Sequence, residues 1–90
     1  MSIASAQVTV STSATLLNTT PEKDAVYGKT AFIRNAGTAD IFIGPAGVTT
    51  ATGFKLSNTD APLRVELGSD DIYGIVATAT QVAHVLLTGV

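Results

Sequence analysis

The stretch that most restricts the fold of this chain is residues 63–77, where two short apolar segments flank a polar turn. From Leu63 to Leu67 apolar side chains alternate with charged ones, and this two-residue period is typical of a half-buried β-strand. The next four residues are Gly, Ser and two Asp, which is the composition of a turn, and a second apolar segment follows. Nearly the whole chain repeats this plan of short strand and turn.

No part of the chain shows the apolar stripe of an amphipathic helix, and the abundance of threonine also favours strands. We predict strands at residues 7–11, 15–17, 29–35, 40–44, 53–56, 63–67, 72–78 and 81–88. The third and fourth are predicted to form a hairpin through a tight turn at 35–38. About eight short strands predict an all-β fold: a single small antiparallel β-sandwich, jelly-roll-like, over residues 7–90. Residues 1–6 are expected to form a flexible N-terminal arm.

Composition points to a protein that associates with other proteins. Only 13% of the 90 residues are charged, the net charge is −2, and there is no cysteine to supplement a core poor in aromatic residues. Contacts between subunits would add the missing stability. The five cations are scattered, which argues against a nucleic-acid surface. Neither a membrane helix nor a signal peptide is expected, because no apolar segment is long enough and the N-terminus carries no cationic region.

No set of residues suggests catalysis, so we expect no enzyme, no cofactor and no metal. His84 is the single histidine and lies inside a predicted strand, which favours a structural or interface role. Asp70 and Asp71 are more simply explained as a solvated turn than as paired catalytic acids or calcium ligands. Asn18 begins a match to the glycosylation pattern, which we interpret as a chance occurrence.

Three segments resemble a group of small virion proteins of tailed bacteriophages. They are Arg-Asn-Ala-Gly-Thr-Ala-Asp-Ile-Phe-Ile-Gly at 34–44, Gly-Val-Thr-Thr-Ala-Thr-Gly-Phe-Lys-Leu at 47–56, and Val-Glu-Leu at 65–67 followed by Asp-Ile-Tyr-Gly-Ile-Val-Ala at 71–77. The resemblance extends from about residue 8 to the C-terminus. It implies a β-rich protein that decorates the capsid, forms the base of a head fibre or is a related head component. It carries over no functional residues, because its motifs are structural.

The expected function is therefore that of a non-enzymatic virion protein on the capsid surface, made in the host cytoplasm. It would bind the major capsid protein or another virion protein as a homo-oligomer, with a trimer favoured. Uncharged segments at 1–6, 48–52 and 87–90 are the predicted contacts, because they lie at or beyond the ends of the clearest strands. The predicted contact residues are Met1, Ser2, Ile3, Ala4, Val48, Thr49, Thr50, Thr52, Leu87 and Val90. A tail, neck or fibre-anchoring component and a small carbohydrate-binding jelly-roll module are the alternatives.

Overall fold

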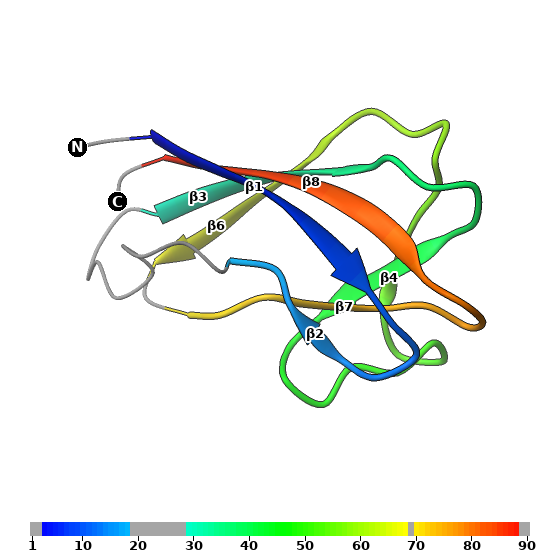
Figure 1. Cartoon of the computed structure of the whole chain (residues 1–90). Coiled ribbons are helices and arrows are strands. Elements are labelled where there is room, and N and C mark those ends of the chain that lie inside the picture. Colours follow the sequence, from blue (N-terminus) through cyan, green and yellow to red (C-terminus); the bar gives the residue numbers. More distant parts are fainter. Residues whose placement is uncertain (1–2, 19–28, 69, 89–90) are drawn as a thin grey trace.

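The alternating segments form eight strands, arranged as two four-stranded antiparallel sheets (Figure 1). The computed structural model describes residues 3–18, 29–68 and 70–88. The strands are β1 (Ile3–Val10), β2 (Thr15–Leu16), β3 (Lys29–Asn35), β4 (Ile41–Gly44), β5 (Phe54–Leu56), β6 (Leu63–Gly68), β7 (Tyr73–Ile75) and β8 (Gln81–Thr88). The all-β sandwich predicted from the sequence is confirmed. The described residues contain no helix, and so none that is long and apolar enough to cross a membrane.

Strand pairing follows one rule along the chain. The first strand pairs with the last, the second with the seventh, the third with the sixth and the fourth with the fifth. Two further pairings, β3 with β8 and β4 with β7, complete the sheet orders β1-β8-β3-β6 and β2-β7-β4-β5. A folded ribbon of strand pairs wound alternately into two sheets is the double-sheet jelly roll. The predicted jelly-roll-like topology is thus confirmed.

The core lies between the two sheets and is built from the buried alternate residues of each strand. In β8, Gln81, Ala83, Val85 and Leu87 are buried, while the residues between them are more exposed. All side chains of the buried cluster are aliphatic, in keeping with a composition poor in aromatic residues. The buried cluster is Val8, Val10, Leu17, Ala31, Ile33, Ile41, Ile43, Leu56, Leu67, Ile72, Val76, Ala83, Val85 and Leu87.

The first strand begins four residues earlier than predicted. Ile3 pairs with Thr88, and the ladder continues without interruption to Val10 opposite Gln81. Residues 3–6 of the expected flexible arm therefore belong to the sheet (Figure 1). Small residues such as Ala6 carry little strand propensity of their own, so pairing with β8 decides their conformation.

The predicted hairpin between residues 29–35 and 40–44 is wrong. Strand β3 pairs with β6 and β8, whereas β4 pairs with β5 and β7, so the connection between them crosses from one sheet to the other. Two buried amides hold this crossing. The Asn35 Nδ2 donates to the carbonyl of Leu56 at 2.8 Å, and the Gln81 Oε1 accepts from the N–H of Thr38 at 2.7 Å. Strand β4 instead forms its hairpin with β5.

Candidate interaction surface

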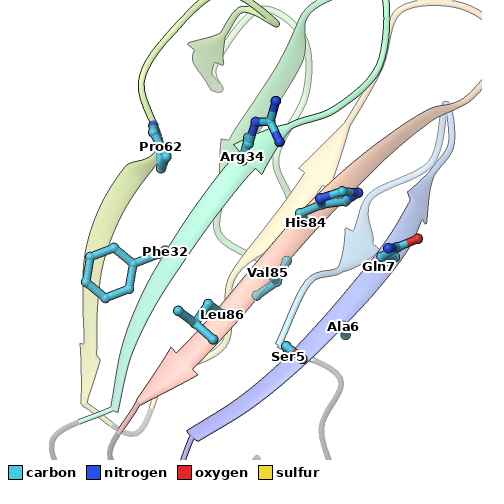
Figure 2. A pocket seen from close by; sticks show the side chains of 9 residues that line it. All are labelled: Ser5, Ala6, Gln7, Phe32, Arg34, Pro62, His84, Val85 and Leu86. Carbon is cyan, nitrogen blue, oxygen red and sulfur yellow. The ribbon is translucent and has the colours of Figure 1, made fainter.

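The outward face of the sheet β1-β8-β3-β6 carries side chains from three neighbouring strands in register. Gln7, His84 and Arg34 lie in one row across β1, β8 and β3. In the next row Leu86 lies opposite Phe32. The residues between them along each strand point into the core, because successive side chains of a strand point to opposite faces. Figure 2 shows the two rows lying along the same side of the sheet.

This face is hollowed by a pocket of about 500 Å³ (Figure 2). Phe32, Leu86 and Pro62 supply an apolar side, and Gln7 and His84 supply hydrogen-bonding groups. Leu86 is 39% exposed, which is unusual for a leucine in the middle of a sheet. The full lining is Ser5, Ala6, Gln7, Phe32, Arg34, Pro62, His84, Val85 and Leu86.

Arg34 supplies a positive charge to the edge of this hollow. Its side chain is exposed, and among the described residues its guanidinium makes no hydrogen bond or ion pair. Arg64, on β6, is instead paired with Glu66 at 3.1 Å. In a chain of net charge −2, Arg34 is therefore a cation that an external carboxylate can bind in the two-pronged geometry that a guanidinium favours.

The outward face of the second sheet also carries apolar side chains, beside the exposed Lys55. Ile43 points into the core, so its neighbour Phe42 points outward, where Ile75 lies opposite it. Tyr73 and Leu16 pair with each other on the same outer face. All four outward side chains are partly exposed. An antiparallel sheet with one face in water normally carries polar side chains there. The pairs Phe32–Leu86 and Phe42–Ile75 depart from that pattern, whereas neighbours such as Arg64 and Lys55 follow it.

Two of the predicted contact residues belong to the core. Val48 is 4% exposed and Leu87 is fully buried, so the side chains of both are absent from the surface, contrary to the prediction. Lack of charge does not separate a contact residue from a core residue. Leu87 is one of the alternate residues of β8 whose side chains are buried.

The threonines of the same loop are on the surface but interact with one another. The N–H of Thr49 donates to the Thr52 Oγ1 at 3.1 Å, and their two hydroxyl oxygens also lie 3.1 Å apart. Thr50 is exposed, with no such partner among the described residues. The loop is thus an ordered turn whose hydroxyl groups are largely engaged.

The remaining predicted contacts lie at the chain ends. Ile3 and Ala4 take part in the β1 ladder through their backbone, opposite Thr88 and Leu87. The other three, Met1, Ser2 and Val90, lie outside the described residues.

The polar residues considered above as possible catalytic, metal-binding or glycosylation sites occupy structural positions. His84 is half-buried on the outer face of β8, and Asp70 and Asp71 are exposed in the turn before β7, as predicted for a turn. Asn18 is fully buried: its Nδ2 donates to the Asp71 Oδ1 at 3.0 Å, and its Oδ1 accepts from the N–H of Ile72 at 3.1 Å. A buried amide of this kind leaves no room for a glycan. Within the described ranges no group of three histidine or acidic side chains could hold a metal ion.

Sequence reasoning missed the apolar residues of the hollow, although a signal was present. Val85, Leu86 and Leu87 are three consecutive apolar residues in one strand, so one of them has to face outward. Ala31, Phe32 and Ile33 repeat the pattern in β3. Wherever a strand interrupts its alternation in this way, an outward apolar side chain results.

No protein-family model, curated protein or solved structure matches this chain.

Proposed function

We propose that this protein is a non-enzymatic structural component of a bacteriophage virion, which decorates or stabilises the capsid by binding to the shell surface as an oligomer. The observation that carries the proposal is an apolar pair on the outward face of each sheet, Phe32 and Leu86 on one and Phe42 and Ile75 on the other. Faces of this kind are suited to contact with neighbouring protein. The resemblance of residues 34–56 and 65–77 to small virion proteins directs the proposal to tailed phages.

The mechanism is mechanical. The hollow around Phe32 and Leu86 accepts an apolar side chain of the shell, while Arg34 beside it meets a carboxylate. The jelly roll pairs its first strand with its last, so both of these strands are held in the sheet that carries the docking face. Each contact that forms with the assembled shell and is lost on dissociation raises the free energy needed to separate the shell subunits.

Co-sedimentation with phage particles tests this proposal. The purified protein is mixed with particles released from the host that expresses it, and the bound amount is compared with that of Leu86→Asp and Asn58→Asp. Leu86→Asp places a carboxylate within the apolar contact and should lower the affinity by on the order of tenfold or more. Asn58→Asp adds the same charge on an exposed turn away from the predicted contacts and should bind like the unmodified protein.

Circular dichroism of both variants confirms that the fold is retained. If the unmodified protein fails to sediment with particles, the virion role is excluded. If both variants bind equally well, the sheet face is excluded as the docking surface. Immunogold labelling of the particles then separates a capsid position from a tail, neck or fibre-anchoring one.

A carbohydrate-binding module is a second candidate, favoured by one observation. The hollow is lined both by the aromatic ring of Phe32 and by the polar side chains of Gln7, His84 and Arg34, and a few polar groups around an apolar wall are the composition of a small-ligand site (Figure 2). A glycan array tests this function. Binding that Phe32→Ala abolishes would favour the module, whereas an array without hits would remove it.

A further inference from the structure

Strand β1 is the one long sheet edge without charge among the strands that the structure describes. The four edge strands are β1, β6, β2 and β5. Two of them, β2 and β5, have only two and three residues. The third, β6, carries Arg64 and Glu66 and pairs with β3 through an irregular register. By contrast, β1 has eight residues, IASAQVTV, with no charge and no proline. Short length, charge and bulges are the devices that keep a sheet edge from pairing with another chain, and β1 has none of them.

The backbone of β1 has hydrogen-bonding groups directed away from its own sheet. The N–H of Ala36 donates to the carbonyl of Val82 at 2.9 Å, so Val82 directs its backbone groups toward β3. These groups alternate along an antiparallel strand, so the next residue, Ala83, directs its own toward its partner Val8 in β1. Every second residue of β1, counted from Val8, therefore pairs with β8, and the residues between them face the edge with which no other described strand pairs. Those residues are Ile3, Ser5, Gln7 and Thr9.

We infer that β1 pairs antiparallel with β1 of a second copy of this chain, about a two-fold axis at Gln7. In this register Gln7 faces its own counterpart, and Ser5 faces Thr9 of the second copy. Each outward pair is thus amide with amide or hydroxyl with hydroxyl, and each partner can both donate and accept. On the inner side, Ala6 faces Val8 of the second copy, so apolar meets apolar. The strand is complementary to itself in backbone, side chains and charge.

This pairing would make one eight-stranded sheet across two molecules. A two-fold axis perpendicular to that sheet keeps the outward faces of both copies on the same side. The two hollows lined by Phe32 and Leu86 would then point in one direction. If the proposed function holds, such a pair would bind the repeating surface of a shell through two sites, with the gain in avidity that linkage provides. The pairing itself does not depend on that function.

Sedimentation equilibrium at high micromolar concentration tests the pairing. The unmodified protein should sediment as a dimer. Gln7→Lys places two like charges directly opposite each other and should raise the dimer dissociation constant at least tenfold. Gln7 is exposed in the single molecule, so circular dichroism should show an unchanged fold. Asn58→Lys adds the same charge on an exposed turn and should leave the dimer intact.

Cysteine cross-linking tests the register, and the absence of native cysteine makes it unambiguous. Gln7→Cys would face its own counterpart at about 5.5 Å between Cα atoms, which is within the range of a disulfide. Mild oxidation should therefore give a covalent dimer. Thr9→Cys would face Ser5 of the second copy, with its own counterpart roughly 13 Å along the strand. Under the same oxidation that variant should form no covalent dimer, although the non-covalent pairing is retained.

Several outcomes would overturn the inference. A monomer or a trimer would do so, because an antiparallel pair of identical strands has two-fold symmetry. A dimer that Gln7→Lys leaves intact and Gln7→Cys does not cross-link would also do so. The proposed function fails separately. A monomer that sediments with phage particles removes the strand pairing and the oligomeric form of binding but leaves the virion role, whereas a dimer that does not bind particles removes only the virion role.

Discussion

Three buried amide side chains lie at places where the chain passes between the sheets. Asn18 precedes the crossing from β2, Asn35 ends β3 and Gln81 begins β8, and all three are at most 9% exposed. An amide taken out of water destabilises the fold unless it is hydrogen-bonded, and each of these has backbone partners on a different segment. Apolar alternation builds the strands, and these amides fix how the strands are connected.

Asn18→Ala should lower the free energy of unfolding by about 2 kcal/mol. The substitution leaves the buried N–H of Ile72 without the Asn18 carbonyl oxygen, and an unpaired buried donor costs about 1–3 kcal/mol. Urea denaturation followed by circular dichroism measures the change. Asn58→Ala, on an exposed turn, should stay within about 0.5 kcal/mol of the unmodified protein. Equal stability of the two variants would show that the Asn18 amide does not hold this crossing.

At the scale of whole elements, the strands were predictable and their partners were not. The alternation of residues 63–67 and 81–88 located β6 and β8 almost to the residue. A tight turn containing glycine, however, looks the same in the sequence whether the chain returns to the same sheet or crosses to the other, and for this reason the hairpin at 29–44 was wrong. The start of β1 was missed because only its distant partner β8 makes residues 3–6 extended.

The candidate surface was less predictable than the fold, for a related reason. Absence of charge marks both contacts and core, so Val48 and Leu87 were mistaken for contacts. Phe32 and Leu86 can be recognised as surface residues only when it is known which alternate residues of their strands point into the core. The hollow is shared by β1, β3, β8 and the segment before β6, and no local pattern brings those segments together.

The glycines on either side of β4 offer a matched test of the crossing between the sheets. A Cβ on Gly37 would meet the Gln81 side chain, whose own Cβ would lie 2.9 Å away, whereas a Cβ on Gly47 would meet nothing within 4 Å. Gly37→Ala should therefore destabilise the protein by about 1–3 kcal/mol, since the buried Gln81 has to move. Gly47→Ala should be neutral or stabilise by up to about 1 kcal/mol. Thermal unfolding of the two variants compares them directly, and a Gly37→Ala protein as stable as Gly47→Ala would contradict this account of the crossing.

The whole molecule folds around contacts between the two ends of its chain. Strand β8 is central in its sheet and pairs with β1, so Ile3 lies opposite Thr88. Among the described strands, β4 and β5 are the one pair that is adjacent both in a sheet and in the sequence; every other pairing joins strands that are distant in the sequence. Because long loops have to close before these pairings contribute stability, we expect refolding to be slow for the length of the chain, with relaxation in about milliseconds to seconds.

The two sheets share one core, so they should also unfold together in a single transition. Far-UV circular dichroism reports all strands, and the fluorescence of Tyr73 in a Tyr27→Phe variant reports the sheet containing β7 alone. Coincident urea transitions by the two probes, with single-exponential refolding after stopped-flow dilution, are the expected result. Refolding within microseconds, or a tyrosine transition displaced from the circular dichroism transition, would mean that one sheet forms without the other. The winding of paired strands into both sheets would then not be what makes this fold cooperative.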